Sequence, residues 1–146
     1  MNEVAAKALF DAEMPALLSL AKLRGWEVQA AAYPLVDVTF ASTERMPLRV
    51  QMHAPDWNDT PPSIALLLPS GEPCPTDKLP RHPMFNQSAH HVTGKPFVCS
   101  IGSKEYHTHP NHLNDPWDNH RGKSKNNLPG LITQIWNGWD KAPKTT

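Results

Sequence analysis

The amino-acid sequence predicts a single α+β domain over residues 1–146, with an N-terminal helix, a four-stranded antiparallel meander, a long irregular segment at about residues 70–127 and a C-terminal helix. Three observations lead to this fold class. The 146 residues include 16 prolines, and a proline inside a helix costs about 3 kcal/mol, so an all-helical fold is excluded. Apolar residues repeat with helical spacing at both ends of the chain. Between the two ends, apolar and polar residues alternate as they do in strands.

Residues 3–24 carry the pattern of an amphipathic helix. Apolar side chains recur at intervals that place them on one face: Phe10, Met14, Leu17, Leu18 and Ala21. Lys22 and Arg24 occupy the last turn and Gly25 follows, a combination typical of a helix end. Because Pro15 lacks an N–H, we expect a kink or a break at that position. The C-terminal helix is predicted from a second apolar face, which consists of Leu131, Ile132, Ile135, Trp136 and Trp139.

Four segments between residues 26 and 68 are typical of a β-meander: residues 26–31, 35–41, 48–53 and 64–68. In the second and third segments apolar residues alternate with polar ones, so each strand is expected to bury one face and expose the other. His53 falls on the exposed face. The fourth segment is a continuous apolar run, which predicts a more fully buried strand.

No periodicity survives between residues 69 and 128, and this segment holds eight of the 16 prolines. Irregular segments of this length are uncommon in compact domains and are usually functional or disordered. Apolar residues that can anchor the segment on the sheet argue against disorder: Phe85, Phe97, Val98, Ile101, Tyr106 and Trp117. We interpret the prolines as stiffeners of a long active-site loop.

Charge and cysteine content limit the functional classes. The chain has 14 basic and 14 acidic residues, so nothing indicates binding to nucleic acid or to an anionic membrane surface. The N-terminus lacks the basic and apolar regions of a signal peptide. We therefore expect a cytoplasmic protein in which Cys74 and Cys99 are reduced thiols. No cofactor is expected.

Histidine placement is the sharpest chemical signal. Seven of the eight histidines lie between residues 82 and 120, around Cys99: His82, His90, His91, His107, His109, His112 and His120. A thiol beside imidazoles is suited to nucleophilic attack on a carbonyl. Zinc binding is an alternative, because Cys99, His107, His109 and His112 supply ligands that zinc accepts. Cys99 can also be a small buried apolar residue with no chemical role.

The order of elements resembles a ubiquitin-conjugating-enzyme (UBC) domain, and in particular the divergent bacterial members encoded beside cGAS-like nucleotidyltransferases in CBASS antiphage operons. Four stretches carry the resemblance: residues 79–83 (LPRHP), residues 90–99 (HHVTGKPFVC), residues 104–110 (KEYHTHP) and residues 115–117 (DPW). It implies a UBC-like fold and a transferase that carries a protein C-terminus as a thioester on Cys99 and passes it to an amine. It further implies a protein partner, the C-terminus of a cGAS-like nucleotidyltransferase, and a role in antiviral defence.

The sequence departs from this family at the oxyanion-supporting asparagine. Eukaryotic members carry a His-Pro-Asn motif ahead of the cysteine, where this chain reads His90, His91 and Val92. If the chemistry is retained, His91, or His107 and His109, has to stabilise the oxyanion or deprotonate the incoming amine. Besides the transferase, two readings stay open: a zinc-binding hydrolase or zinc-stabilised domain, and a non-catalytic UBC-like binding module.

Overall fold

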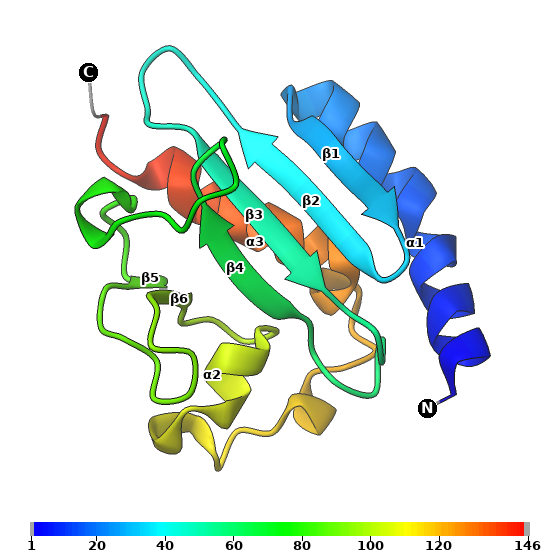
Figure 1. Ribbon diagram of the computed structural model, residues 1–146. Coiled ribbons are helices and arrows are strands. Elements are labelled where there is room, and N and C mark those ends of the chain that lie inside the picture. The colour runs from blue at the N-terminus through cyan, green and yellow to red at the C-terminus, as the bar shows by residue number, and fades with distance from the viewer. Residues whose placement is uncertain (1, 145–146) are drawn as a thin grey trace.

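The computed structural model describes residues 2–144 and has the α+β architecture that the sequence predicts. Its main elements are α1 (Glu3–Arg24), β1 (Glu27–Ala32), β2 (Leu35–Phe40), β3 (Leu48–His53), β4 (Ser63–Leu67) and α3 (Leu128–Lys141). The four strands form one antiparallel sheet in the order β1-β2-β3-β4 (Figure 1). In the described part of the chain, no helix is both long enough and apolar enough to cross a membrane.

Helix α1 begins and ends at the residues that the sequence indicates. The Asn2 side chain accepts a hydrogen bond from the Ala5 N–H at 2.8 Å and caps the first turn. At the other end Gly25 has φ +73°, the left-handed conformation that favours glycine after a helix. The helix continues through Pro15 over its full 22 residues, so it is a single element and not two pieces.

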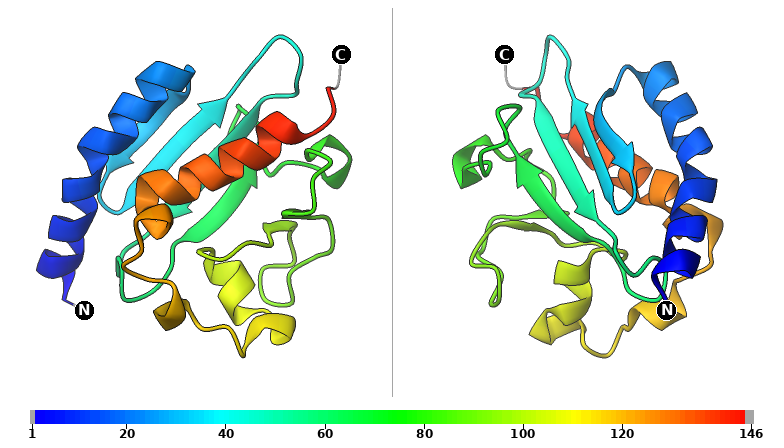
Figure 2. Two further views of the ribbon diagram at one scale, coloured as in Figure 1. Left: turned by 180° about the vertical axis from the view of Figure 1, so that it is seen from behind. Right: turned by 45° about the vertical axis from the view of Figure 1, so that its right-hand side comes forward.

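Both helices pack against the sheet. Helix α3 crosses one face of the sheet, whereas α1 lies along its β1 side and also contacts α3 (Figure 2). The Glu13 carboxylate on α1 accepts hydrogen bonds from the Trp57 indole N–H at 2.7 Å and from the Leu128 N–H at 2.5 Å. These bonds join α1, the β3–β4 connection and the start of α3, so one carboxylate fixes the positions of three distant segments.

Strand β2 differs from the prediction, because its polar face is also buried. Asp37 and Thr39 are each 2% exposed. The Asp37 carboxylate accepts two hydrogen bonds from the Arg49 guanidinium, at 2.9 and 2.7 Å, and a third from the Gln51 amide at 3.2 Å. Thr39 donates to the Gln29 side chain at 3.0 Å. Long side chains of the neighbouring strands therefore cover a face that the alternating pattern assigns to solvent.

Strand β4 also differs from the prediction of a fully buried strand. Ile64 and Leu66 are buried, whereas Ser63, Ala65 and Leu67 are only partly so. The strand lies at the edge of the sheet, with β3 on one side. An edge position explains the partial burial, because within residues 2–144 the backbone pairing on the other side of β4 is limited to the short stretch of residues 72–74.

The segment that lacks periodicity is folded onto this edge as a series of short elements. They are η1 (Thr76–Lys78), β5 (Phe85–Asn86), β6 (Phe97–Val98), α2 (Lys104–Thr108), η2 (Pro110–His112), η3 (Trp117–Asn119) and η4 (Ser124–Asn126). Strands β5 and β6 form a separate two-stranded sheet. Of the expected anchors, Phe85, Phe97, Val98 and Trp117 are buried, and Ile101 and Tyr106 are partly buried. The prediction that apolar residues pin this segment is confirmed.

Candidate active site

Cys99 follows β6 directly and is held in place by backbone contacts. Its N–H donates to the Met84 carbonyl at 2.6 Å, next to β5. The Ser103 hydroxyl donates to the Val98 carbonyl at 2.7 Å and accepts from the Tyr106 N–H at 3.0 Å, which caps α2. The thiol is therefore fixed between a small sheet and a capped helix. The residue as a whole is half-buried.

A glycine fixes the turn between Cys99 and α2. Gly102 has φ +100°, and a Cβ atom there would lie 2.2 Å from Cδ2 of Leu131 on α3. Only glycine combines this backbone conformation with so close an approach. The turn can therefore lie directly on the C-terminal helix.

His112 is the histidine that the structure brings to the thiol. Its Nε2 atom lies 3.6 Å from Cys99 Sγ, within hydrogen-bond reach for sulfur. The imidazole stacks on the Tyr106 ring, with ring centroids 4.0 Å apart and an interplanar angle of 17°. The stack holds the imidazole against the α2 side of the site, so Cys99 and His112 form a thiol–imidazole pair.

Asp115 organises the groups behind this pair. Its carboxylate accepts from the Tyr106 hydroxyl at 2.8 Å and pairs with His120 Nε2 at 2.7 Å. The bonds from His120 and then from Tyr106 lower the pKa of Asp115. Burial, and next the bond to Asp115, raise the pKa of Tyr106 to about 12, so its hydroxyl stays a donor at neutral pH. The ring that supports His112 is thus held by an ionised carboxylate.

His107, one of the predicted site residues, is hydrogen-bonded through both ring nitrogens. Nε2 accepts from the Gly102 N–H at 3.0 Å, and Nδ1 lies 2.8 Å from the Asp115 carbonyl, which fits an Nδ1–H donor. Burial lowers the pKa of His107, which favours this neutral form. The ring therefore connects the turn after Cys99 to the Asp115 segment, and it makes no hydrogen bond to the thiol within residues 2–144.

His109 and His91, also predicted site residues, belong to a ring stack beside the thiol. His109 stacks on Phe97 with centroids 5.6 Å apart and lies 5.7 Å from the His112 ring. Its Nδ1 accepts from the Asn111 N–H, and burial, followed by the neighbouring histidines, lowers its pKa. His91 is exposed, and its ring centroid lies 6.0 Å from that of His109. In the described chain neither ring hydrogen-bonds Cys99.

His90 holds the loop on which His91 lies. It is 2% exposed, and its Nδ1 accepts from the Val92 N–H at 3.1 Å. Nε2 lies 2.9 Å from the Glu105 carbonyl, to which it donates. Both nitrogens are therefore used within the fold, and the ring closes the turn that begins at residue 90.

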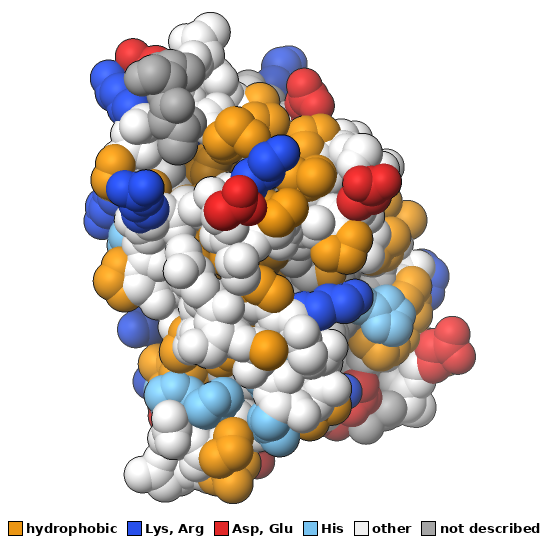
Figure 3. Space-filling model, turned by 60° about the vertical axis from the view of Figure 1, so that its left-hand side comes forward, with side chains coloured by type: hydrophobic (Ala, Val, Ile, Leu, Met, Phe, Trp, Pro, Cys, Tyr) orange, Lys and Arg blue, Asp and Glu red, His pale blue; other side chains and the backbone are white. Residues whose placement is uncertain are grey.

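Several of the histidines lie close together without forming a metal site. Figure 3 shows histidine side chains gathered toward the lower end of the face that it presents. Over residues 2–144, no group of three or more His, Cys, Asp or Glu side chains has the arrangement needed to hold a metal ion. The four ligands of the zinc alternative, namely Cys99, His107, His109 and His112, are therefore not gathered around one point.

Sequence reasoning named His112 only as a possible zinc ligand and did not select it as the partner of the thiol. The two residues are thirteen positions apart, and they meet because α2 and η2 reverse the chain. Neither short helix has a periodic signature in the sequence. The same reversal brings His112 onto the Tyr106 ring, six positions earlier in the chain. No sequence pattern predicts this stacking either.

One comparison with known proteins matches the part of the chain that contains this site. A sequence model of the Y4jH-like family matches residues 84–141, from the loop before β5 to the end of α3. The protein named "Uncharacterized protein y4jH" of Sinorhizobium fredii (strain NBRC 101917 / NGR234) is 38% identical over 47 residues. That match covers 32% of this chain and 23% of the relative's length. Residues 84–141, which include the site, are thus similar to that family.

Proposed function

We propose that this protein is a UBC-like cysteine acyltransferase in which Cys99 carries a protein C-terminus as a thioester. The observation that carries the proposal is the pairing of a half-buried thiol with an imidazole, Sγ of Cys99 lying 3.6 Å from His112 Nε2. The helix, four-stranded meander, irregular segment and closing helix also agree with the element order of that fold. The UBC-like identity itself comes from the sequence resemblance.

The proposed reaction consists of two acyl transfers. In the first, the Cys99 sulfur attacks the carbonyl carbon of an acyl group that is already a thioester on a donor. A new C–S bond forms, the donor's C–S bond breaks, and the donor leaves as a thiol with the proton that Cys99 gives up. In the second, a lysine amine attacks the same carbon. A C–N bond forms, Cys99 leaves as the thiolate, and the proton of the amine passes to a base.

His112 is the residue placed to act on the sulfur. As a base it takes the thiol proton before attack, and as an imidazolium it stabilises the thiolate that leaves. His107 has a different task in this scheme, because it fixes the Gly102 amide and thereby the turn after Cys99. His91 is the exposed member of the ring stack, and we assign it the support of the oxyanion in place of the missing asparagine.

Tyr106 and Asp115 are positioning residues in this proposal. The Tyr106 ring stacks on His112, and its hydroxyl is held by Asp115. Tyr106→Phe keeps the stack and loses the hydroxyl bond, whereas Tyr106→Leu loses both. We expect Tyr106→Leu to displace the pH profile of acyl transfer and Tyr106→Phe to retain most of the activity. A structural role alone would lower the amount of folded protein without moving the profile.

The acyl group in this proposal is that of the C-terminus of a cGAS-like nucleotidyltransferase, as the resemblance implies, and the setting is antiviral defence. A gene for such an enzyme beside the gene for this protein would support the assignment. The direct test is to prepare the nucleotidyltransferase with its C-terminus as a thioester, to mix it with this protein, and to look for a covalent adduct that thiol reductants cleave. No adduct in any combination with neighbouring gene products would argue against this donor.

The chemistry can be tested without knowing the donor. The probe is a synthetic peptide thioester, whose acyl group should move to Cys99 and be released by dithiothreitol. Cys99→Ser should give either no adduct or an oxyester that resists dithiothreitol, and Cys99→Ala should give none. Cys74→Ala is the matched control, because the Cys74 thiol is buried and should not carry the acyl group. An adduct that persists in Cys99→Ala and vanishes in Cys74→Ala would refute the assignment.

The role of His112 has its own matched control. His112→Gln should slow acyl transfer by about 10²-fold or more, the usual contribution of a positioned acid or base. His82→Gln removes a histidine that accepts a hydrogen bond from the Met84 N–H and, within residues 2–144, makes no hydrogen bond to the thiol. Equal rates in the two variants would show that the imidazole near the sulfur does not take part.

A further inference from the structure

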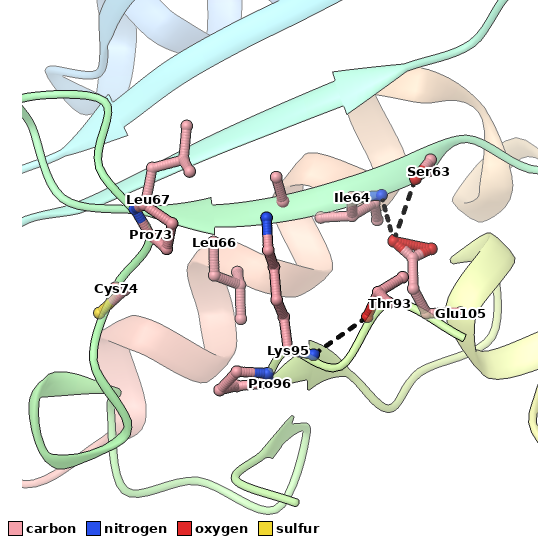
Figure 4. A pocket seen from close by; sticks show the side chains of 11 residues that line it. Ser63, Ile64, Leu66, Leu67, Pro73, Cys74, Thr93, Lys95, Pro96 and Glu105 are labelled. Atoms are coloured by element: carbon pink, nitrogen blue, oxygen red, sulfur yellow. Dashed lines mark hydrogen bonds between the residues drawn. The ribbon is translucent and has the colours of Figure 1, made fainter. Parts of the chain in front are cut away.

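A groove runs between the edge of β4 and the loop of residues 90–96. It consists of two adjoining cavities of about 190 Å³ each, which share Ser63, Thr93 and Glu105. The first extends along β4 toward Cys74, and the second extends past Glu105 toward His90. Figure 4 shows the first cavity, with Glu105 at one end and Cys74 at the other. Together the cavities reach the size at which ligand sites begin, about 300 Å³.

The floor of the groove is a sheet edge that is only partly filled, because residues 72–74 pair with its far end at Leu67 and the groups around Ala65 stay open. The Ile64 N–H donates to Glu105 Oε1, and the Leu66 carbonyl accepts from the Cys74 N–H, so both residues turn their backbone groups away from β3. Residues whose amide faces the edge also turn their carbonyl to it. The Ile64 carbonyl and the Leu66 N–H therefore face the groove. In the described chain neither group has a hydrogen-bond partner.

A buried carboxylate oxygen lies beside these backbone groups. Glu105 is 5% exposed, and its Oε1 accepts from Ile64 N–H at 2.6 Å and from the Ser63 hydroxyl at 3.3 Å. Its other oxygen, Oε2, is buried without a partner. A polar atom left unpaired in this way costs about 1–3 kcal/mol unless a ligand or water meets it. The groove thus contains three polar groups that lack partners.

The rim of the groove is basic. Lys95 lines the first cavity and Lys104 lines the second, and both side chains are exposed. In Figure 4 the Lys95 side chain extends across β4 beside Leu66. Among the groups that line the two cavities, Glu105 is the acidic one, and it is buried. A ligand that enters the groove therefore meets positive charge at the rim and hydrogen-bonding groups at the floor.

We propose that this groove binds an extended acidic peptide segment of a partner protein as an added strand on β4. An extended main chain offers one N–H and one C=O per residue, which is what the Ile64 carbonyl and the Leu66 N–H lack. A single peptide residue beside Ala65 uses both groups when it runs parallel to β4. Acidic side chains then reach Lys95 and Lys104, and a neighbouring peptide group meets Glu105. This binding does not depend on the chemistry proposed for Cys99.

The test is an NMR titration of the full-length, ¹⁵N-labelled protein with a capped peptide of alternating valine and glutamate. We expect saturable binding that shifts the Leu66 amide resonance downfield and slows its hydrogen exchange. Two control peptides test separately the contribution of peptide charge and that of the backbone hydrogen bond. Replacing the glutamates by lysines reverses the charge, and N-methylation of the central valine removes the donor to Ile64. Both changes should weaken binding strongly.

Matched protein variants test the rim. Lys95→Glu reverses a charge at the groove, and Lys22→Glu makes the same change on α1, next to the opposite edge of the sheet. We expect Lys95→Glu to weaken binding of the glutamate peptide about three- to tenfold and Lys22→Glu to leave it unchanged. Absence of saturable binding, binding without a response at Leu66, or equal binding of the lysine peptide would each overturn the proposal.

Discussion

Replacing Glu105 by glutamine is expected to stabilise the protein at neutral pH, and the gain is expected to disappear in acid. Burial raises the pKa of the Glu105 carboxyl above its ordinary value of 4.5, although hydrogen bonds from Ile64 and Ser63 act in the opposite direction. With a raised pKa, the folded state holds the proton more tightly than the unfolded chain does. The stability that Glu105 contributes is therefore complete below pH 4.5 and is lost as the pH rises through the folded-state pKa.

The size of the effect follows from that pKa. Each unit by which the folded-state pKa of Glu105 exceeds 4.5 removes about 1.4 kcal/mol of unfolding free energy at neutral pH. In Glu105→Gln the side-chain oxygen still accepts from Ile64 N–H, and the amide cannot ionise. The amide nitrogen of the glutamine takes the place of Oε2, so a polar atom without a partner is present at this position in both proteins. The variant is therefore expected to match the wild type below pH 4.5 and to exceed it by a constant amount above the folded-state pKa.

Urea unfolding, followed by tryptophan fluorescence between pH 4 and pH 8, measures this difference. Glu105→Ala is the control, because it leaves the buried Ile64 N–H without an acceptor and should be about 1–3 kcal/mol less stable than Glu105→Gln at every pH. A Glu105→Gln protein that is less stable than the wild type at pH 7 would refute the reasoning. So would a difference in unfolding free energy that does not change with pH.

Three further predictions concern other buried or reactive groups. Iodoacetamide should label Cys99 at least about tenfold faster than Cys74, because Cys74 is 5% exposed and burial raises the pKa of its thiol; peptide mass spectrometry measures both rates. Arg49→Leu should lower the unfolding free energy by about 3 kcal/mol, because it leaves the Asp37 carboxylate buried without its cation, and a loss below about 0.5 kcal/mol would contradict this. The lowered pKa of His107 predicts that stability present above pH 6.5 is lost as the pH falls, and His107→Gln should show a smaller decrease between pH 7 and pH 5 in the same unfolding assay.

Local patterns predict the main elements because the forces that form them act within a few residues. The cap at Asn2, the apolar face of α1 and the glycine at its end lie within that helix or next to it. Strand β3 spans the predicted residues, and α3 covers the predicted apolar face. Where the prediction is wrong, a distant partner is the cause. Asp37 is buried because Arg49 and Gln51 of β3 neutralise and cover it, and no pattern within β2 contains that information.

The candidate site also combines features that the sequence predicts with features that only the tertiary structure determines. The positions of the residues along the chain show a cysteine surrounded by histidines in a proline-rich segment. The proposed chemistry depends on this cysteine, Cys99. Which histidine meets the thiol is not a local property, since His90 and His107 use both ring nitrogens to hold the backbone and His112 reaches the sulfur through a reversal of the chain.

The sequence by itself thus determined the fold class, the order of the elements and the histidine-rich region around Cys99, because these depend on periodicity and residue type. The tertiary structure decided the pairing of Cys99 with His112, the burial of Asp37 and the unpartnered Glu105 carboxylate oxygen at the partly open edge of β4. Each of these is a contact between segments far apart in the chain. Their geometry is fixed by how the short elements of residues 68–127 pack on the sheet, and that packing has no repeating signature in the sequence.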